Sequence, residues 1–171
     1  MPWYAIRSRR IFEAERTLAP LCQDSYLPKE KVRDVRTKGL RERAIIPRLM
    51  FIKTTEPEAL DLEVKSRDSA NKIEPFFLYR NVAGTRPSEV TQREMDLMML
   101  LTADDDRKCE IYHKDNIREG DRIRVISGPF EGYEGYARRI RKNKHVVVEI
   151  EGLCAIALPY IHPALLEKIE E

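Results

Sequence analysis

The sequence predicts an α+β domain that is joined by a linker to a small β-barrel. In the first 102 of the 171 residues, stretches of helical and strand periodicity alternate, which is typical of helices packed on an antiparallel sheet. After residue 119, five of the seven glycines lie among short strands. Dense turns between short strands favour a strongly bent barrel. We therefore expect the α+β domain at 1–102, the linker at 103–117 and the barrel at 118–171.

The chain begins with a predicted strand and a predicted helix. Residues 3–8 read as a short strand, and apolar residues then recur at helical spacing from Ile11 to Leu21. That helix should end within 20–23. The charged stretch after Pro28, with Gly39 inside it, predicts a solvent-exposed β-hairpin.

The middle of the α+β domain contains a buried strand and two helix starts. Residues 45–52 are nearly all apolar, so they should form a central strand, with a bulge or its beginning at Pro47. Capping-box patterns at 55–58 and 91–94 each predict the start of a helix. A further strand is expected at 75–79. The predicted order is therefore β-α-β-β-β-α-β-α.

The net charge of +2 conceals strongly segregated charges. Residues 29–43 are rich in basic side chains but also hold Glu30, Asp34 and Glu42, so a plain charged hairpin is expected there. Residues 138–144 contain five basic residues and no acid, a composition that would attract nucleic acid or an acidic protein surface. These five are Arg138, Arg139, Arg141, Lys142 and Lys144.

Several classes of function are disfavoured by what the sequence lacks. Three cysteines, far apart and without a CxxC pair, fit a reducing cytoplasm and argue against structural zinc. The three histidines have no ligand spacing, so neither a metal nor another cofactor is expected. Motifs of hydrolases, phosphate-binding loops and zinc proteases are missing, which argues against an enzyme. No apolar run approaches the ~20 residues that a membrane span needs, and the N-terminus lacks a signal-peptide pattern.

Two parts of the chain carry a family resemblance. The run 120–136 reads as a strand, a Gly128–Pro129 turn, two more glycines at three-residue spacing and a second strand. It resembles the KOW module, an SH3-like barrel of ribosomal proteins and NusG-related transcription factors. Trp3-Tyr4, the basic hairpin and the strand Ile-Pro-Arg-Leu-Met-Phe-Ile resemble the NGN domain of NusG-type elongation factors. The order of NGN domain, linker and KOW module is more specific than either part.

The branch of the family is indicated by two further segments. Housekeeping NusG usually carries a Gly-Val-x-Gly-Phe-Val-Gly segment before its third helix, and residues 76–84 lack it. Residues 138–161 are similar to the UpxY-type antiterminators of Bacteroidales, which are encoded at the head of capsular polysaccharide operons. The resemblance implies a cytoplasmic transcription elongation or antitermination factor of this specialised kind. The alternatives are a housekeeping NusG-like factor and a ribosome-associated or RNA-binding KOW protein.

The resemblance also implies where the N-terminal domain binds its partners. An apolar face of the NGN domain docks on the clamp helices of RNA polymerase, and the matching positions here are Ile46, Leu49 and Phe51. Alternatively, these residues fill the core beneath the helices. The edge that faces upstream DNA and the displaced non-template strand matches Arg7, Arg9, Arg10 and Arg16, and leader RNA is the other candidate nucleic acid. Alternatively, these arginines belong to a solvated helix face with Glu13 and Glu15 as partners.

The C-terminal barrel has an implied partner surface of its own. Phe130 and Tyr133 lie on the turn where related KOW barrels meet a ribosomal protein or the termination factor Rho. Alternatively, Phe130 packs inside the barrel.

Overall fold

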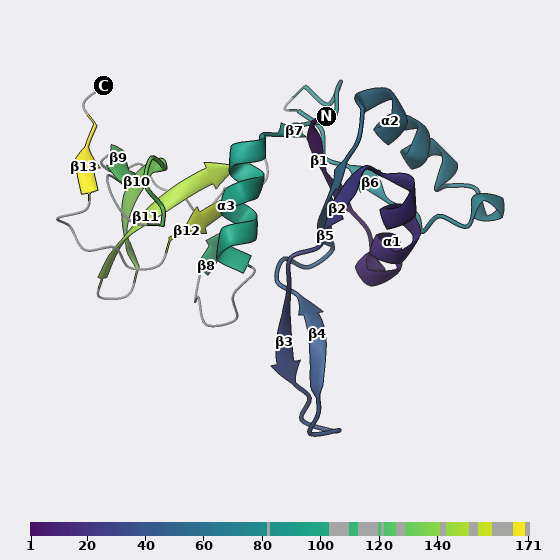
Figure 1. Ribbon diagram of the computed structural model, residues 1–171, viewed down its shortest axis with the longest axis horizontal. Helices are drawn as coiled ribbons and strands as arrows, with labels where there is room; N and C mark the ends of the chain where they lie inside the picture. The colour runs from purple at the N-terminus through teal and green to yellow at the C-terminus, as the bar shows by residue number, and fades with distance from the viewer. Residues whose placement is uncertain are drawn as a thin grey trace. The chain divides into compact units, whose positions relative to one another are not determined.

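The computed structural model describes two compact units, Met1–Asp105 and Asp106–Glu171 (Figure 1). The described residues are 1–81, 83–102, 110–112, 120, 122–125, 129–140, 143–150, 154–158 and 166–169.

The first unit is built on a five-stranded antiparallel sheet with the order β2-β5-β1-β6, in which β7 also pairs with β1. Its strands are β1 (Trp3–Arg7), β2 (Asp24–Tyr26), β5 (Leu49–Lys53), β6 (Phe77–Leu78) and β7 (Glu89–Val90). The strand predicted at 3–8 is confirmed, and β5 is a central strand as expected. However, β5 begins at Leu49 and not at residue 45, because Arg48 adopts a left-handed backbone (φ 65°) after Pro47.

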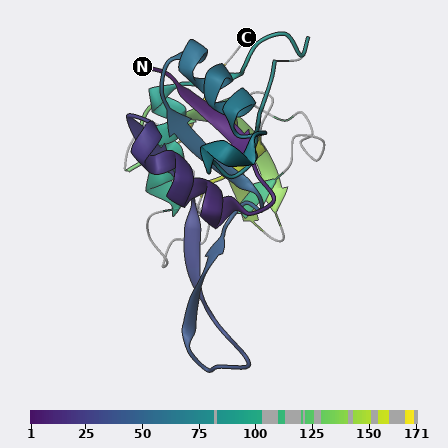
Figure 2. The same cartoon turned by 90° about the vertical axis from the view of Figure 1, so that its right-hand side faces the viewer.

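Helices cover both faces of this sheet (Figures 1 and 2). Helices α1 (Ile11–Leu18) and α2 (Glu56–Lys65) share one hydrophobic cluster with β1 and β5, while α3 (Gln92–Thr102) lies on the opposite face. The short 3-10 helices η1 (Ala19–Leu21) and η2 (Ser69–Asn71) follow α1 and α2. Both predicted capping boxes form, at Thr55 with Glu58 and at Thr91 with Glu94.

The predicted charged hairpin is present as the separate two-stranded sheet of β3 (Lys29–Arg33) and β4 (Leu40–Ala44). It projects from the rest of the first unit (Figure 2). Pro28 separates β2 from β3, since proline has no N–H to continue a ladder.

The described part of the second unit forms a six-stranded antiparallel sheet with the order β13-β9-β10-β11-β12-β8. Its strands are β8 (Glu110–Tyr112), β9 (Arg122–Val125), β10 (Glu134–Ile140), β11 (Asn143–Ile150), β12 (Cys154–Ala157) and β13 (Leu166–Lys168). Val125, Val147 and Ala155 are buried in it. Closure of this sheet into a barrel stays a prediction. One difference concerns the segment 103–117, where the expected linker contains β8, a strand paired with β12.

Candidate functional site

A pocket of about 620 Å³ lies at the end of β1, where three segments that are distant in the sequence meet. Its lining contains four guanidinium groups, one carboxylate and one aromatic ring. The lining residues are Arg7, Ser8, Arg9, Arg10, Arg48, Glu74, Pro75 and Phe77. We call this set the arginine pocket.

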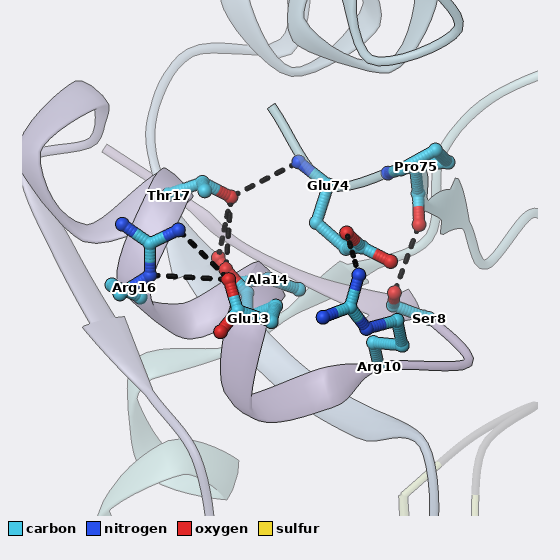
Figure 3. Close-up of polar contacts among 8 residues, drawn as sticks. All are labelled: Ser8, Arg10, Glu13, Ala14, Arg16, Thr17, Glu74 and Pro75. Atoms are coloured by element: carbon cyan, nitrogen blue, oxygen red, sulfur yellow. Dashed lines mark hydrogen bonds and ion pairs between the residues drawn. The ribbon is translucent and has the colours of Figure 1, made fainter. Parts of the chain in front are cut away.

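The backbone of the arginine pocket is fixed by Ser8, which is 3% exposed. Its amide N–H donates to the carbonyl oxygen of Arg48 at 3.0 Å. Its hydroxyl donates to the carbonyl oxygen of Pro75 at 2.8 Å, as Figure 3 shows. These two bonds join the end of β1 to the segments that precede β5 and β6. The backbone that carries the arginines is therefore fixed before a ligand binds, which lowers the entropic cost of binding.

The charges of the arginine pocket are only partly compensated. Arg10 forms an ion pair with Glu74 at 3.7 Å, and its side chain remains 69% exposed (Figure 3). Arg7, Arg9 and Arg48 are exposed, and within the described residues no ion pair joins any of them to a carboxylate. The pocket thus presents uncompensated positive charge to solvent, which suits phosphate groups.

Arg16, the fourth predicted arginine, does not line the pocket. It pairs with Glu13 at 2.8 Å one helical turn away, on the surface of α1 (Figure 3). The hydrogen bond from Arg16 lowers the pKa of Glu13, so the two groups stabilise each other's charged forms. This arrangement is the solvated pair that the sequence offered as the alternative for this residue.

Five residues of the pocket lining were not predicted from the sequence, and two of them, Arg48 and Phe77, carry groups that could contact a nucleic acid. Arg48 is the one charged residue in the apolar stretch 45–52, and this exception could have marked it as a candidate site residue. Phe77 is 54% exposed, and it pairs with Arg7 in the β1–β6 register. An exposed aromatic ring beside arginines is the arrangement on which nucleic-acid bases stack.

The predicted docking residues are buried in this structure. Ile46, Leu49 and Phe51 are 8%, 1% and 0% exposed, respectively. Met50 and Ile52 belong to the cluster with α1 and α2, so strand alternation turns Leu49 and Phe51 to the opposite face, on which α3 lies. This burial favours the alternative that they pack the core, and their docking role stays a prediction.

Helix α3 is tied to its face of the sheet by side-chain hydrogen bonds near both of its ends, one of them from Lys53 Nζ to Gln92 Oε1 at 3.4 Å. The indole N–H of Trp3 donates to Gln92 Oε1 at 2.9 Å, and the hydroxyl groups of Tyr26 and Thr102 bond to each other. Since Gln92 and Thr102 are the first and last residues of α3, the helix is held at both ends.

Comparison with known proteins identifies the family. No protein-family model matches the chain. The transcription termination/antitermination protein NusG of Borreliella burgdorferi is 30% identical over 135 residues, which are 75% of this chain and 72% of that protein. This chain belongs to the NusG family.

Two solved structures of other proteins are similar to this NusG-family chain. One, described as domain interaction in Thermotoga maritima NusG, has a TM-score of 0.49 at 19% identity and covers 99% of this chain and 97% of that one. The other, an MjSpt4:Spt5 complex, has a TM-score of 0.29 at 15% identity with the same coverage. The family assignment rests on the sequence relative.

In the second unit of the NusG-family chain, the two predicted partner residues differ in solvent exposure. Phe130 is 7% exposed, in keeping with the alternative that it packs inside, while Tyr133 is half-buried. Among the predicted basic residues, Arg139 pairs with Lys144 in the register of β10 and β11, and Arg138 is the next residue of β10. Arg141 and Lys142 lie outside the described residues. The backbone therefore brings three of the five positions to one end of a two-strand ladder.

The described residues of this NusG-family protein contain no group of three or more histidine, cysteine or acidic side chains that could hold a metal ion. In the same part of the chain, no helix has the length and apolar character needed to cross a membrane.

Proposed function

We propose that this chain is a specialised NusG paralogue that binds RNA polymerase, suppresses pausing or termination, and acts on polysaccharide biosynthesis operons. The observation that carries the transcriptional role is the match to a NusG protein over 135 residues. This match is longer than the first unit, Met1–Asp105, so it extends into the second. A ribosome-associated KOW protein would share only the second unit, so the length of the match favours the transcription factor.

The proposed mechanism requires binding alone and no chemical step. The first unit docks on the clamp helices of the polymerase and bridges its cleft. From there the arginine pocket contacts the displaced non-template DNA or a leader RNA. Guanidinium groups at Arg9 and Arg48 would neutralise backbone phosphates and release counterions, and Phe77 would stack on a base. The bridged polymerase then resists pausing.

The buried residues of β5 have a supporting role in this proposal. Leu49 and Phe51 lie on the face of the sheet that carries α3, so they hold the docking surface in shape from below. Ile46, which is nearly as buried, lies in the turn that sets the start of β5; the amide N–H of Leu49 donates to its carbonyl oxygen.

The specialised branch is supported by residues 76–84, which lack the glycine-rich segment of housekeeping members. Here the segment is fastened to α2: the amide N–H of Leu78 donates to Glu63 Oε2 at 2.6 Å, and Arg80 forms an ion pair with Glu63 at 2.7 Å. A glycine-rich loop would have no side chain to make the second of these contacts. The operon assignment itself is supported by the resemblance of residues 138–161 to UpxY-type proteins.

The second unit would contact a ribosomal protein or Rho in this proposal. Tyr133 presents more surface than the buried Phe130, so it is the better candidate for that contact.

The experiment that tests the proposed function is transcription in vitro with purified core RNA polymerase. Two templates are compared, one with a capsular polysaccharide leader and one with an unrelated promoter, each followed by a pause site and a terminator. We expect the protein to bind the polymerase and to raise read-through more on the leader template. Equal read-through on both would indicate the housekeeping alternative. Absence of polymerase binding together with cosedimentation with ribosomes would overturn the transcriptional role.

A further inference from the structure

The β3–β4 hairpin divides into a charge-paired root and an unpaired basic tip. At the root, Lys29 Nζ lies 3.2 Å from Glu15 Oε1 and 3.8 Å from Glu42 Oε2, and Arg43 forms an ion pair with Glu30. Both acids of the hairpin's strands, Glu30 and Glu42, therefore have cationic partners at the root. Within the described residues, neither acid forms an ion pair with a cation farther out along the hairpin.

The tip, residues 31–41, has one acid and five cations. Asp34 is the acid, and its Oδ1 accepts hydrogen bonds from the amide N–H groups of Arg36 at 2.8 Å and Thr37 at 3.3 Å. These bonds lower the pKa of Asp34, so its carboxylate is committed to the turn. The five cations are all exposed, and no ion pair within the described residues reaches any of them. They are Lys31, Arg33, Arg36, Lys38 and Arg41.

The tip is also preorganised. The amide N–H of Asp34 donates to the carbonyl oxygen of Gly39 at 2.8 Å, and that of Lys38 donates to the carbonyl oxygen of Asp34 at 2.9 Å. At the root, Lys29 Nζ also lies 6.0 Å from the ring centre of Phe12 on α1. The hairpin is therefore anchored to the body at one end and closed by a fixed turn at the other, so the backbone positions that carry its cations are set before any partner binds.

The register puts cations on both faces of the ribbon. Arg33 pairs with Leu40 and Val32 pairs with Arg41, so Arg33 and Arg41 lie on opposite faces. The turn between them carries Val35, which is 94% exposed, and Leu40 beside it is 74% exposed. A protein surface with a single acidic patch would meet one face only. A groove with phosphates along both walls would meet both.

We propose that residues 31–41 bind B-form duplex DNA by entering its major groove. That groove, about 12 Å wide, admits a two-stranded β-ribbon. Cations on the two faces of the ribbon contact the phosphates of the two walls, and Val35 makes apolar contact with the base edges, for which a thymine methyl is the best match. The major groove of an RNA duplex is too narrow for side chains to read, so the partner is DNA. This site is separate from the arginine pocket and does not rest on the proposed function.

The test measures binding of the full chain to a fluorescent DNA duplex of about 20 base pairs, by anisotropy over a range of salt concentrations. The tip variant Arg36→Gln/Lys38→Asn is compared with the control Lys65→Gln/Lys72→Asn. Each removes two exposed positive charges, and Lys38 and Lys72 share a left-handed backbone, at φ 56° and 55°. We expect the slope of log affinity against log salt to fall by about two units in the tip variant alone, since each lost phosphate contact removes roughly 0.9.

A second variant, Val35→Ser, separates the apolar contact from the charge. It should weaken duplex binding severalfold and leave the salt slope unchanged. A single strand and an RNA duplex of the same sequence are measured alongside. A wild-type slope in the tip variant would overturn the proposal, as would equal losses on all three nucleic acids. Loss of polymerase binding with duplex binding intact would assign the tip to an acidic protein surface instead. The DNA assay contains no polymerase. A negative result in it would therefore overturn the hairpin proposal without bearing on the proposed function.

Discussion

Glu63 is a buried acidic residue of the first unit whose charge is stabilised by the fold. Its side chain is 2% exposed, and it accepts hydrogen bonds from Leu78 and Arg80. Burial raises the pKa of Glu63, but the hydrogen bonds from Arg80 and from the Leu78 amide outweigh burial and leave the pKa below its ordinary value. The ionised form is therefore the form that the fold stabilises.

We predict that Glu63→Gln lowers the free energy of unfolding at neutral pH by about 2–3 kcal/mol, because it removes one partner of a buried ion pair. The expected loss is smaller than for a fully buried pair, since Arg80 is partly exposed. Urea unfolding measures it. The control is Glu56→Gln, whose exposed pair with Arg86 should leave the midpoint almost unchanged. Equal midpoints for the two variants would contradict the role given to Glu63.

The pH dependence follows from the direction of the same shift. A carboxyl group whose pKa is lower in the folded state stabilises the fold above its unfolded pKa, and this stabilisation is lost as the pH falls through the folded value. Wild-type protein should therefore lose stability below the ordinary value of 4.5. Glu63→Gln should show a shallower loss over that range in thermal unfolding, and an identical profile would exclude Glu63 as the group responsible.

At the arginine pocket we predict that Phe77→Ala weakens binding of single-stranded DNA by about 1–3 kcal/mol, the usual worth of one stacked base. Phe77 is 54% exposed, so its melting temperature should stay close to that of wild type. Leu21→Ala, which removes an exposed apolar side chain outside the pocket, is the control. If both variants bind DNA like wild type, the ring does not stack.

Single residues show what sequence reasoning could and could not reach at this site. Arg7, Arg9 and Arg10 were predicted from the resemblance, and the structure brings them together because they follow one another at the end of β1. Arg48 and Phe77 come from other segments, and the pairing of β5 and β6 with β1, together with the tertiary hydrogen bonds of Ser8, places those segments beside β1. Contacts between segments so far apart in the chain cannot be predicted from sequence spacing.

At the scale of elements, local signals predicted helices better than strand limits. Both capping boxes were predicted because all their atoms lie within four consecutive residues. The structure places the start of β5 at Leu49, two residues after Pro47, because Arg48 has a left-handed backbone that apolar composition does not reveal. The sequence also did not predict that the hairpin has an ion-paired root and an unpaired tip. That difference depends on which cation pairs with each acid across the two strands and with Glu15 on α1.

For the first capping box, Thr55→Ala should lower the unfolding free energy by about 1 kcal/mol, because the Glu58 amide loses its acceptor at the start of α2. Thr55→Ser keeps the hydroxyl oxygen and should restore most of the loss. Chemical denaturation of the three proteins provides the comparison, and an uncorrected loss in the serine variant would mean that the methyl group, not the cap, is responsible.

For strand β5, the double substitution Leu49→Ala/Phe51→Ala should destabilise the first unit strongly, since truncating a buried leucine or phenylalanine costs about 2–5 kcal/mol each. Binding to core polymerase and the melting temperature are measured on the same samples. A variant that melts much earlier yet still binds polymerase when folded would assign both side chains to the core alone. Loss of binding at temperatures where the variant is folded would support their part in docking.

At the scale of the whole molecule, the chain is predicted to consist of two units that fold independently. The structure divides it after Asp105, and β8 at Glu110–Tyr112 belongs to the second sheet. A fragment that starts at residue 106 retains the β8–β12 ladder, whereas one that starts at 118, the boundary expected from sequence, leaves β12 at the edge of the sheet, paired with β11 alone. We therefore expect both fragments to show a β-type circular dichroism spectrum and the longer one to melt at a higher temperature. Equal melting temperatures would mean that β8 adds nothing to the second unit, and an unfolded 1–105 fragment would show that the first unit needs the second.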